Sequence, residues 1–345
     1  MLSRVANSLY WMVRYIERAD NLARLIDVNG QLLLDHERLD SDRLRAFWKP
    51  IILSTGDEVL FADLYSEAGS AEVIRFLTND RKNPSSIVSS IVQARENARM
   101  VRDQLSEELW EELNGLYLFI NSRDGELLLA ADPSRYYETI RRATFSFHGI
   151  AAASIARSEA WDFMDLGRHL ERADKTTRFL DITSFLPEPE VVPGNGSGSF
   201  HSTAILRSCG ALGAFRAAHR GEPSSQSVVD FLIFSRDFPR SVRFCVDRID
   251  RNLHSISGAP RGTYTNDAER VAGRLLSELS YGSTEEVLEN GLHAYLDQTQ
   301  AKFNEIGEEL FHSYVLLPDT DKRPPIPAAN MSAVVAWQMA QQQQQ

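Results

Sequence analysis

The sequence predicts an all-α protein built from two homologous helical bundles, which come from an internal duplication and pack about a pseudo-two-fold axis. Two observations lead to this prediction: a charged segment occurs twice in the chain, and apolar residues recur at helical spacing. A third observation agrees with them, because no stretch alternates apolar and polar residues between turns as a β-strand does.

A charged segment near the N-terminus is repeated 154 positions later. The first copy is RYIERADNLARLID, residues 14–27, and the second is RHLERADKTTRFLD, residues 168–181. Seven of the fourteen positions are identical. Average composition would give about one identity by chance, so the match indicates common descent.

Two later segments recur in the same order and at nearly the same offset. PIILSTG (50–56) matches AILRSCG (204–210), and VIRFLTNDRKNPSSI (73–87) matches VVDFLIFSRDFPRSV (228–242). Three matched blocks in one order indicate that the whole chain is a duplication.

The duplication divides the chain into two predicted helical repeats, residues 1–155 and 156–316. The remaining segment, 317–345, has proline breaks and a glutamine run and is expected to be disordered. The segment PEPEVVPGNGSGS, 187–199, lies inside the second repeat. We therefore interpret it as a mobile loop and not as a domain linker.

Local signals predict where individual helices begin. The first helix starts near Ser3 and runs into the thirties, with one broad apolar arc. Asparagine or aspartate before proline predicts helix starts at 83–84 and at 132–133. NDAE (266–269) and STEE (283–286) have the spacing of a capping box.

Composition limits the classes of function. The chain has 37 basic and 48 acidic residues, a formal charge of -11, which argues against a general nucleic-acid binder. Cys209 and Cys245 form neither a metal-binding nor a disulfide pattern. The apolar runs are shorter than the ~20 residues that span a bilayer, and no cleavable leader is recognisable. We therefore expect a cytoplasmic protein without a membrane partner.

The repeated charges are the candidate functional residues. On a helical wheel of the first helix they lie opposite the apolar face or on its flank. They are Arg14, Glu17, Arg18, Asp20 and Arg24 in the first copy, and Arg168, Glu171, Arg172, Asp174 and Arg178 in the second.

These charges have two interpretations. In the first, they form solvated ladders within each helix, with Arg14 next to Glu17 and each pair worth ~0.2–0.5 kcal/mol. Arg24 would then pair with Asp20 and Asp27. In the second, the two helices meet, and arginines of one pair with carboxylates of the other. We favour this seam, because the helix start is apolar nearly all round and the copies match in identity as well as charge. A polar pocket beside the seam is an alternative.

A metal site is a further alternative, since carboxylates spaced i, i+3 on two helices can hold a hard cation such as Mg²⁺. The four carboxylates would be Glu17, Asp20, Glu171 and Asp174. Arginines crowd them, however, and no histidine stands at i+3 as it does in di-iron bundles. We therefore expect no metal and no cofactor.

Several segments resemble the Alpha-E family, which is named for an all-helical domain with a repeated Glu-Arg motif. They are SLYWMVRYIERADNLARLID, ARENARMVRDQLSEELWEELN, ILRSCGALGAFR and RDFPRSVRFC, and the resemblance extends to about residue 316. Through it, the motif positions here are Glu17-Arg18 and Glu171-Arg172. The segment ARENAR adds further binding candidates, namely Arg95, Glu96, Asn97 and Arg99. Of these only Asn97 has an identical counterpart, Asn252, in the second half.

The resemblance implies candidate partner proteins but no specific reaction. Genes of Alpha-E proteins commonly lie beside, or are fused to, genes for a circularly permuted ATP-grasp protein and a transglutaminase-like protease. ATP-grasp enzymes join carboxylates to amines through acyl phosphates, so the family is expected to serve a peptide or amide ligation system. The present chain has no nucleotide-binding motif and no catalytic signature. His169 is not expected to be a catalytic base, and His148 is expected to be a core histidine.

Three hypotheses of function follow. The leading one is a non-catalytic, accessory subunit that presents a peptide-like substrate to an ATP-grasp ligase or grips the ligase itself. The second is an enzyme with a Glu/Arg-lined active site between the repeats, which binds the carboxylate and amine of a peptide or amino-acid-like substrate. The third is a purely structural interaction bundle.

Overall fold

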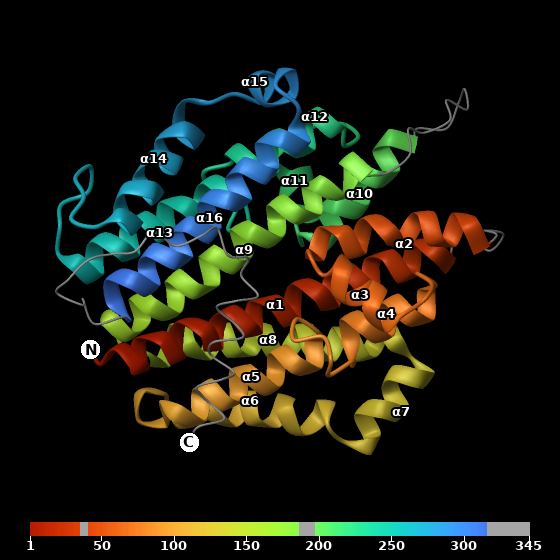
Figure 1. Ribbon diagram of the computed structural model, residues 1–345, viewed down its shortest axis with the longest axis horizontal. Helices are drawn as coiled ribbons and strands as arrows, with labels where there is room; N and C mark the ends of the chain where they lie inside the picture. Colours follow the sequence, from red (N-terminus) through yellow and green to blue (C-terminus); the bar gives the residue numbers. More distant parts are fainter. Residues whose placement is uncertain (35–40, 186–196, 316–345) are drawn as a thin grey trace.

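The computed structural model describes residues 1–34, 41–185 and 197–315, and every regular element within them is helical. Its centre is a pair of long helices, α1 (Ser3–Leu34) and α9 (Glu159–Phe185), which lie side by side (Figure 1). They run in the same direction, since the N-terminal amino group contacts Glu159 while Arg18, further along α1, contacts Glu171. The predictions of an all-α class and of a long first helix are confirmed for these residues.

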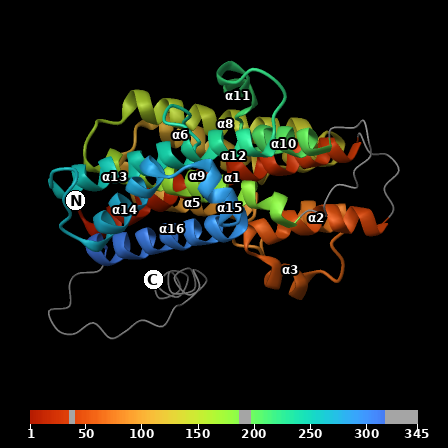
Figure 2. The ribbon, with the colours of Figure 1, turned by 90° about the horizontal axis from the view of Figure 1, so that it is seen from above.

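Each central helix is covered by its own set of helices. The set against α1 consists of α5 (Ile87–Met100), α8 (Pro133–Ser154) and, across both, α6 (Glu107–Ile120). The set against α9 consists of α13 (Val242–Ser257), α16 (Leu292–Tyr314) and, across both, α14 (Asp267–Tyr281). In Figure 1 the first set lies below α1 and the second lies above α9. Figure 2 shows α8 and α16 on opposite sides of the central pair.

Two shorter helices cross between the sets. α2 (Ser41–Thr55) follows α1 but packs against α9, and α10 (Ser197–Ser208) follows α9 but packs against α1. The other short helices are α3 (Glu58–Leu64), α4 (Ser70–Thr78), η1 (Arg102–Gln104), α7 (Arg123–Ala131), α11 (Leu212–Ala218), α12 (Ser225–Phe234) and α15 (Thr284–Glu289). Because of this crossing, a single buried apolar cluster contains side chains from both sets.

Most predicted helix starts are confirmed. Asp132 caps α8 by accepting a hydrogen bond from the backbone N–H of Arg135, with Pro133 as the first helical residue. Asn266 caps α14 in the same way. Ser283 and Glu286 form the predicted capping box of α15.

The predicted helix start at 83–84 is wrong. α5 begins at Ile87, and its N-cap is Ser86, whose hydroxyl accepts a hydrogen bond from the backbone N–H of Ser89 at 3.2 Å. The side chain of Asn83 instead points inward and donates to the carbonyl oxygen of Phe76 at 3.0 Å. Asn83 therefore fixes a buried turn rather than a helix end.

Some predictions fall wholly or partly outside the described residues. This is the case for the tail at 317–345 and for the loop at 187–199, whose last three positions belong to α10. The predicted boundary between residues 155 and 156 falls in the connection between α8 and α9. The division into two repeats stays a prediction at this point.

Candidate functional site: a buried Glu–Arg seam

The two Glu-Arg dipeptides face each other across the contact between α1 and α9. Arg18 donates from Nε to Glu171 Oε1 at 2.7 Å and from Nη2 to Oε2 at 3.1 Å. In return, Arg172 donates from Nε to Glu17 Oε1 at 2.9 Å and from Nη2 to Oε2 at 2.8 Å. Each arginine thus binds the glutamate of the other helix with both arms of its guanidinium fork, the geometry that lysine cannot supply. We call this pair of exchanged contacts the Glu–Arg seam.

Both glutamates are fully buried and have further cationic partners. On what we call the Glu171 side, Arg14 donates from Nε to Glu171 at 2.8 Å, and the Lys175 Nζ lies 3.9 Å away. On the Glu17 side, Arg240 Nη1 lies 2.9 Å from Glu17, and His148 Nε2 lies 3.2 Å from it. The predicted pairing of arginines with carboxylates of the other half is confirmed by these distances.

The next turn of each helix carries a second ion pair. Arg24 donates to Asp20 at 3.0 Å, and Arg178 donates to Asp174 at 2.9 Å. These i, i+4 pairs lie within one helix, as the ladder interpretation expects for Arg24. Arg240 ties Asp20 to a distant part of the chain, with 2.6 Å between its Nη2 and the carboxylate.

The other ladder pairs are wrong. Arg14 bonds to Glu171 and not to Glu17. Asp27 pairs with Arg141 of α8 at 3.2 Å and not with Arg24, and it accepts a hydrogen bond from Ser134. The reason is burial. Because α1 is covered on all sides here, its carboxylates are not solvated and pair with basic or hydroxyl groups of neighbouring helices.

Two glycines allow the arginines of the second turn to lie against the opposite half. Gly210 and Gly56 both adopt positive φ angles, 62° and 75°, which favour glycine. A Cβ atom at Gly210 would sit 3.2 Å from Arg24 Nη1, and one at Gly56 would sit 3.4 Å from Arg178 Nη1. Both are among the positions shared by the repeated segments, which gives their identity a physical reason.

The electrostatics of the seam hold its glutamates in the charged form. Burial alone would raise the pKa of Glu17, but Arg172 and Arg240 lower it well below its usual range. Burial acts in the same way on Glu171, and Arg18 and Arg14 overcome it, so its pKa is also lowered. Carboxylates held so strongly in the charged form are poor proton acceptors.

Arg168 differs from its counterpart Arg14. Its Nη2 contacts Asp165 on the same helix, and Arg248 of α13 lies 3.3 Å from the other oxygen of that carboxylate. Asn252 also donates to Asp165, at 2.9 Å. Arg168 therefore belongs to a neighbouring cluster centred on Asp165.

The ARENAR candidates lie apart from the seam. Arg95 donates to Glu96 at 2.6 Å, and Arg99 donates to the same carboxylate at 3.0 Å. Asn97 donates to the backbone of its own helix. The Arg95 guanidinium lies over Trp110 of α6, 5.4 Å from the ring centroid, so this cluster fastens α5 to α6.

Two residues beside the seam were not among the predicted site residues. His148 was expected to be a core histidine, and it is largely buried, with its Nε2 3.2 Å from Glu17. Burial lowers the pKa of His148, and Glu17 only partly offsets this effect. Arg240 was not singled out at all. Its signal was available: in the matched segments it replaces Ser85, between a shared proline and a shared helix-capping serine.

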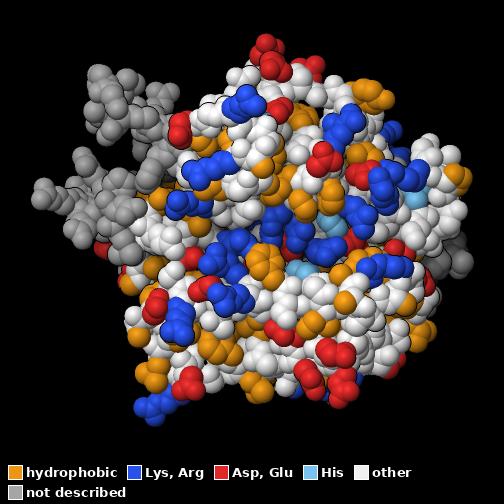
Figure 3. All heavy atoms as spheres, turned by 180° about the vertical axis from the view of Figure 1, so that it is seen from behind, with side chains coloured by type: hydrophobic (Ala, Val, Ile, Leu, Met, Phe, Trp, Pro, Cys, Tyr) orange, Lys and Arg blue, Asp and Glu red, His pale blue; other side chains and the backbone are white. Residues whose placement is uncertain are grey.

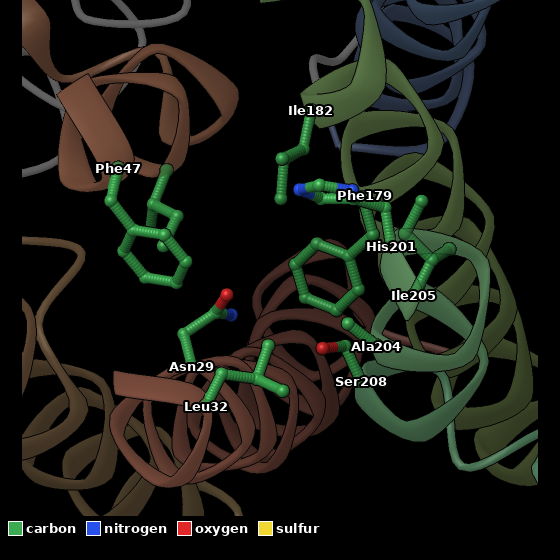
Figure 4. Close-up of a pocket in the computed structure, with 10 residues that line it drawn as sticks. Asn29, Leu32, Phe47, Phe179, Ile182, His201, Ala204, Ile205 and Ser208 are labelled. Carbon is green, nitrogen blue, oxygen red and sulfur yellow. The ribbon is translucent and has the colours of Figure 1, made fainter. Parts of the chain in front are cut away.

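A small apolar cavity lies further along the contact between α1 and α9 (Figure 4). Its volume is ≈ 40 Å³, and its lining includes Leu32, Phe47, Phe179 and Ile205. None of the Glu–Arg seam residues lines it. Since small-molecule sites are typically ~300–1,000 Å³, this cavity does not provide the substrate pocket that an enzyme between the repeats would need.

One cluster among the described residues has ligand atoms close enough for a metal ion: Asp181, His293 and Asp297. His293 Nδ1 already lies 2.8 Å from Asp181, and both His293 and Asp297 are exposed. The four carboxylates considered in the sequence are paired with arginines or Lys175, which leaves them poorly suited to bind a cation. Within the described residues, no helix combines the length and apolar character needed to cross a bilayer.

Fold and site together define a class: an all-helical protein whose two longest helices are joined by exchanged, buried Glu–Arg pairs. The model of the Alpha-E family, described as a predicted alpha-helical domain with a conserved ER motif, matches residues 1–315. The chain belongs to this family.

The chain is also similar to curated proteins from mycobacteria. The "Uncharacterized protein Rv2567" of Mycobacterium tuberculosis (strain ATCC 25618 / H37Rv) and the "Uncharacterized protein Mb2597" of Mycobacterium bovis are each 26% identical to the chain over 340 residues. The alignment covers 91% of this chain but only 37% of each relative, so the chain spans little more than a third of their length. No solved structure matches the chain.

Proposed function

We propose that the helices α1–α8 and α9–α16 are two copies of one unit, related by a pseudo-two-fold axis that runs along the Glu–Arg seam. Three features support this. The helices α5 and α8 cover α1 as α13 and α16 cover α9. The glutamate–arginine contacts are exchanged in both directions. The Gly56–Arg178 contact likewise has a partner in Gly210 and Arg24.

We further propose that the chain is a non-catalytic, accessory subunit of an ATP-grasp-linked peptide or amide ligation system. One observation carries this proposal: the side chains of the family motif form hydrogen bonds and ion pairs with one another. Glu17, Glu171 and Arg18 are buried, Arg172 is largely so, and all four are paired. Side chains paired in this way stabilise the fold and are not available to a substrate. The chain would then act as a scaffold that binds a ligase or its peptide-like substrate.

The length of the relatives supports an accessory role. More than half of each mycobacterial relative lies outside the part that resembles this chain. A module found within a larger chain is well suited to work beside another protein. The proposed ATP-grasp partner consumes ATP, so the proposal places the chain in the cytoplasm. A transglutaminase-like protease is a second candidate neighbour.

Co-purification tests the proposal. The tagged full-length chain should retain its cognate circularly permuted ATP-grasp protein at about micromolar concentration, but not an ATP-grasp ligase from an unrelated system. Ligation by the partner should be faster with the chain present than without it. If neither association nor acceleration is seen, the chain is better described as an interaction bundle for other partners.

The enzyme hypothesis makes an opposite prediction about the seam. Replacing both glutamates by glutamine would abolish turnover and leave folding intact if they acted on a substrate. Because they are buried counterions, we expect the double variant Glu17→Gln, Glu171→Gln to lose folded protein instead, with activation of the ligase lost in proportion. Circular dichroism and the ligation assay on the same preparation separate the two outcomes.

A further inference from the structure

The Glu17 side of the seam holds more positive than negative charge. Among the described residues, three carboxylates lie there: Glu17 and Asp20, which share Arg240, and Asp165, which is held by Arg168. Five arginines contact them, namely Arg24, Arg168, Arg172, Arg240 and Arg248. The arginines therefore outnumber the carboxylates that they contact by two, and such an excess in a largely buried cluster is costly unless an anion compensates it.

Hydrogen-bond donors are also left over in this cluster. Arg168 contacts Asp165 through Nη2, and its buried Nε has no hydrogen-bond partner. His148 Nε2 lies 3.2 Å from Glu17 and has no second partner. Buried donors normally have partners, so the unsatisfied Nε of Arg168 beside surplus charge indicates a binding function.

The cluster is open to solvent on one face. The side chains of Arg248 and Arg168 are 35% and 19% exposed. Figure 3 shows Lys, Arg and His side chains gathered in a recess near the middle of the face turned away from the viewer in Figure 1. An anion can therefore reach the arginines between α8 and α13 without unfolding the seam.

The Glu171 side lacks these features. Asp57 lies close to Lys175 and Arg18 and adds a third carboxylate there, whereas the matching position on the Glu17 side is Ala211. The hydroxyl of Tyr10 accepts a hydrogen bond from Arg14 at 2.9 Å and lies against Gly307 of α16. By the same count this side has four cations, Arg14, Arg18, Lys175 and Arg178, for three carboxylates, so its surplus is one charge rather than two. The smaller surplus and the aromatic cover distinguish it from the Glu17 side.

We propose that Arg168 and Arg248, with His148 beside them, form a binding site for a small ligand that carries a doubly charged oxyanion group, either a phosphate or a pair of carboxylates. Guanidinium forks match the oxygen spacing of both groups, and two negative charges neutralise the surplus. The proposal concerns the isolated chain and does not rest on a ligase partner.

Calorimetric titration of the full-length chain tests it, with inorganic phosphate and with glutarate as separate probes. We expect one saturable site for at least one of them. Saturation by phosphate assigns a phosphate-bearing ligand, and saturation by glutarate alone assigns a dicarboxylate. Arg168→Gln and Arg248→Gln should each weaken binding by about tenfold or more, since each removes charge-assisted hydrogen bonds.

The matched control is Arg142→Gln. Arg142 lies on α8 in an exposed pair with Glu138, so this variant removes the same charge from the surface alone. It should bind as the parent does. Arg248 is the least buried of the cluster arginines, so its variant is expected to fold even if Arg168→Gln does not. The proposal is overturned if neither probe saturates a single site, or if Arg248→Gln binds as tightly as Arg142→Gln.

Discussion

Glu17 and Glu171 occupy matching places on α1 and α9, and each accepts both arms of an arginine from the other helix. The further basic partners of the two glutamates come from different parts of the chain. Glu171 has Arg14 and Lys175, from the two central helices themselves. Glu17 has Arg240, from the segment before α13, and His148, from α8.

This difference shows which residues hold the two helices together and which make the two sides unlike. The positions that match between segments 14–27 and 168–181 make the exchanged pairs, which hold α1 and α9 together. The positions that do not match change the charge around the two glutamates. In the aligned segments, Lys175 corresponds to Asn21 and Asp57 corresponds to Ala211. The shared residues therefore stabilise the contact between α1 and α9. The unshared residues leave the Glu171 side covered and the Glu17 side open to solvent.

The largest expected effect on the free energy of unfolding comes from removing a seam carboxylate. Glu171→Gln leaves Arg14, Arg18 and Lys175 buried without their main counterion, and breaking a buried pair in this way costs about 3–5 kcal/mol. Glu17→Gln should cost a similar amount, because Arg240 keeps Asp20 but Arg172 has no other carboxylate partner among the described residues. Chemical denaturation measures both.

The exposed Glu138 provides the control for this prediction. It pairs with Arg142 on the surface of α8, and Glu138→Gln should change the free energy of unfolding by less than about 1 kcal/mol. If Glu171→Gln were as mild as this control, the seam would not be what joins the two helices.

Acid should weaken the two sides in a different order. The pKa of Glu171 is lowered from 4.5 in the folded state, so its contribution to stability is present above 4.5 and is lost as the pH falls toward the folded value. The pKa of His148 is lowered from 6.5, so its contribution is lost earlier, as the pH falls below 6.5.

Stability against pH therefore distinguishes the variants. The difference between the parent and His148→Asn should shrink as the pH falls from about 7 to about 5, and that between the parent and Glu171→Gln only below about 4.5. The free energy of unfolding from denaturant titrations at each pH provides the measurement. Equal shrinkage of both differences over one pH range would contradict the assignment of the two groups.

A smaller effect is expected where the backbones of α1 and α9 approach each other. Gly167 of α9 has no room for a Cβ atom, which would collide with the carbonyl oxygen of Tyr10. Gly167→Ala must therefore push the helices apart and strain both sides of the seam, at a cost of about 1–3 kcal/mol.

Gly149 is the natural comparison for this variant. It lies exposed within α8, with no atom close to the place of a Cβ. Gly149→Ala should stabilise the protein by up to about 1 kcal/mol, because alanine favours the helix. Thermal unfolding of the two variants, followed by circular dichroism, should therefore shift in opposite directions.

The sequence predicted the central pair because the information lies in the repeat. Retained arginine and aspartate identities in both copies indicated geometry rather than surface charge, and Arg18 and Arg172 indeed bind with both arms. The helix class followed from spacing and from caps such as Asp132. These signals are local or are duplicated, so one chain is enough to find them.

The open side could not be predicted in the same way. Arg240 and His148 reach Glu17 through tertiary contacts across 223 and 131 positions, and neither belongs to a matched identity. The cap predicted at Asn83 failed for a local reason, since its side chain donates to the carbonyl oxygen of Phe76, seven positions earlier. A long-range contact made by a single residue produces no repeated or periodic pattern in the sequence, so one sequence does not reveal it.

The smallest expected effect concerns Asp57, which makes the Glu171 side more negative than its counterpart. Burial raises the pKa of Asp57 above 3.8, and one of its oxygens has no hydrogen-bond partner, while Lys175 and Arg18 attract its charge. These effects oppose each other, so Asp57→Ala should change stability by no more than about 1 kcal/mol.

The pH dependence of this variant has the opposite sign to that of Glu171→Gln. A raised folded-state pKa means that ionisation of Asp57 weakens the folded state as the pH rises through that value. Asp57→Ala should therefore gain stability relative to the parent near pH 7 and lose that gain below about 3.8. Asp57→Asn, which keeps the shape, should behave alike if charge is the cause. A marked loss of stability at neutral pH in both variants would instead make Asp57 an essential counterion of Lys175, and the Glu171 side would be closed by charge rather than by the cover of Tyr10.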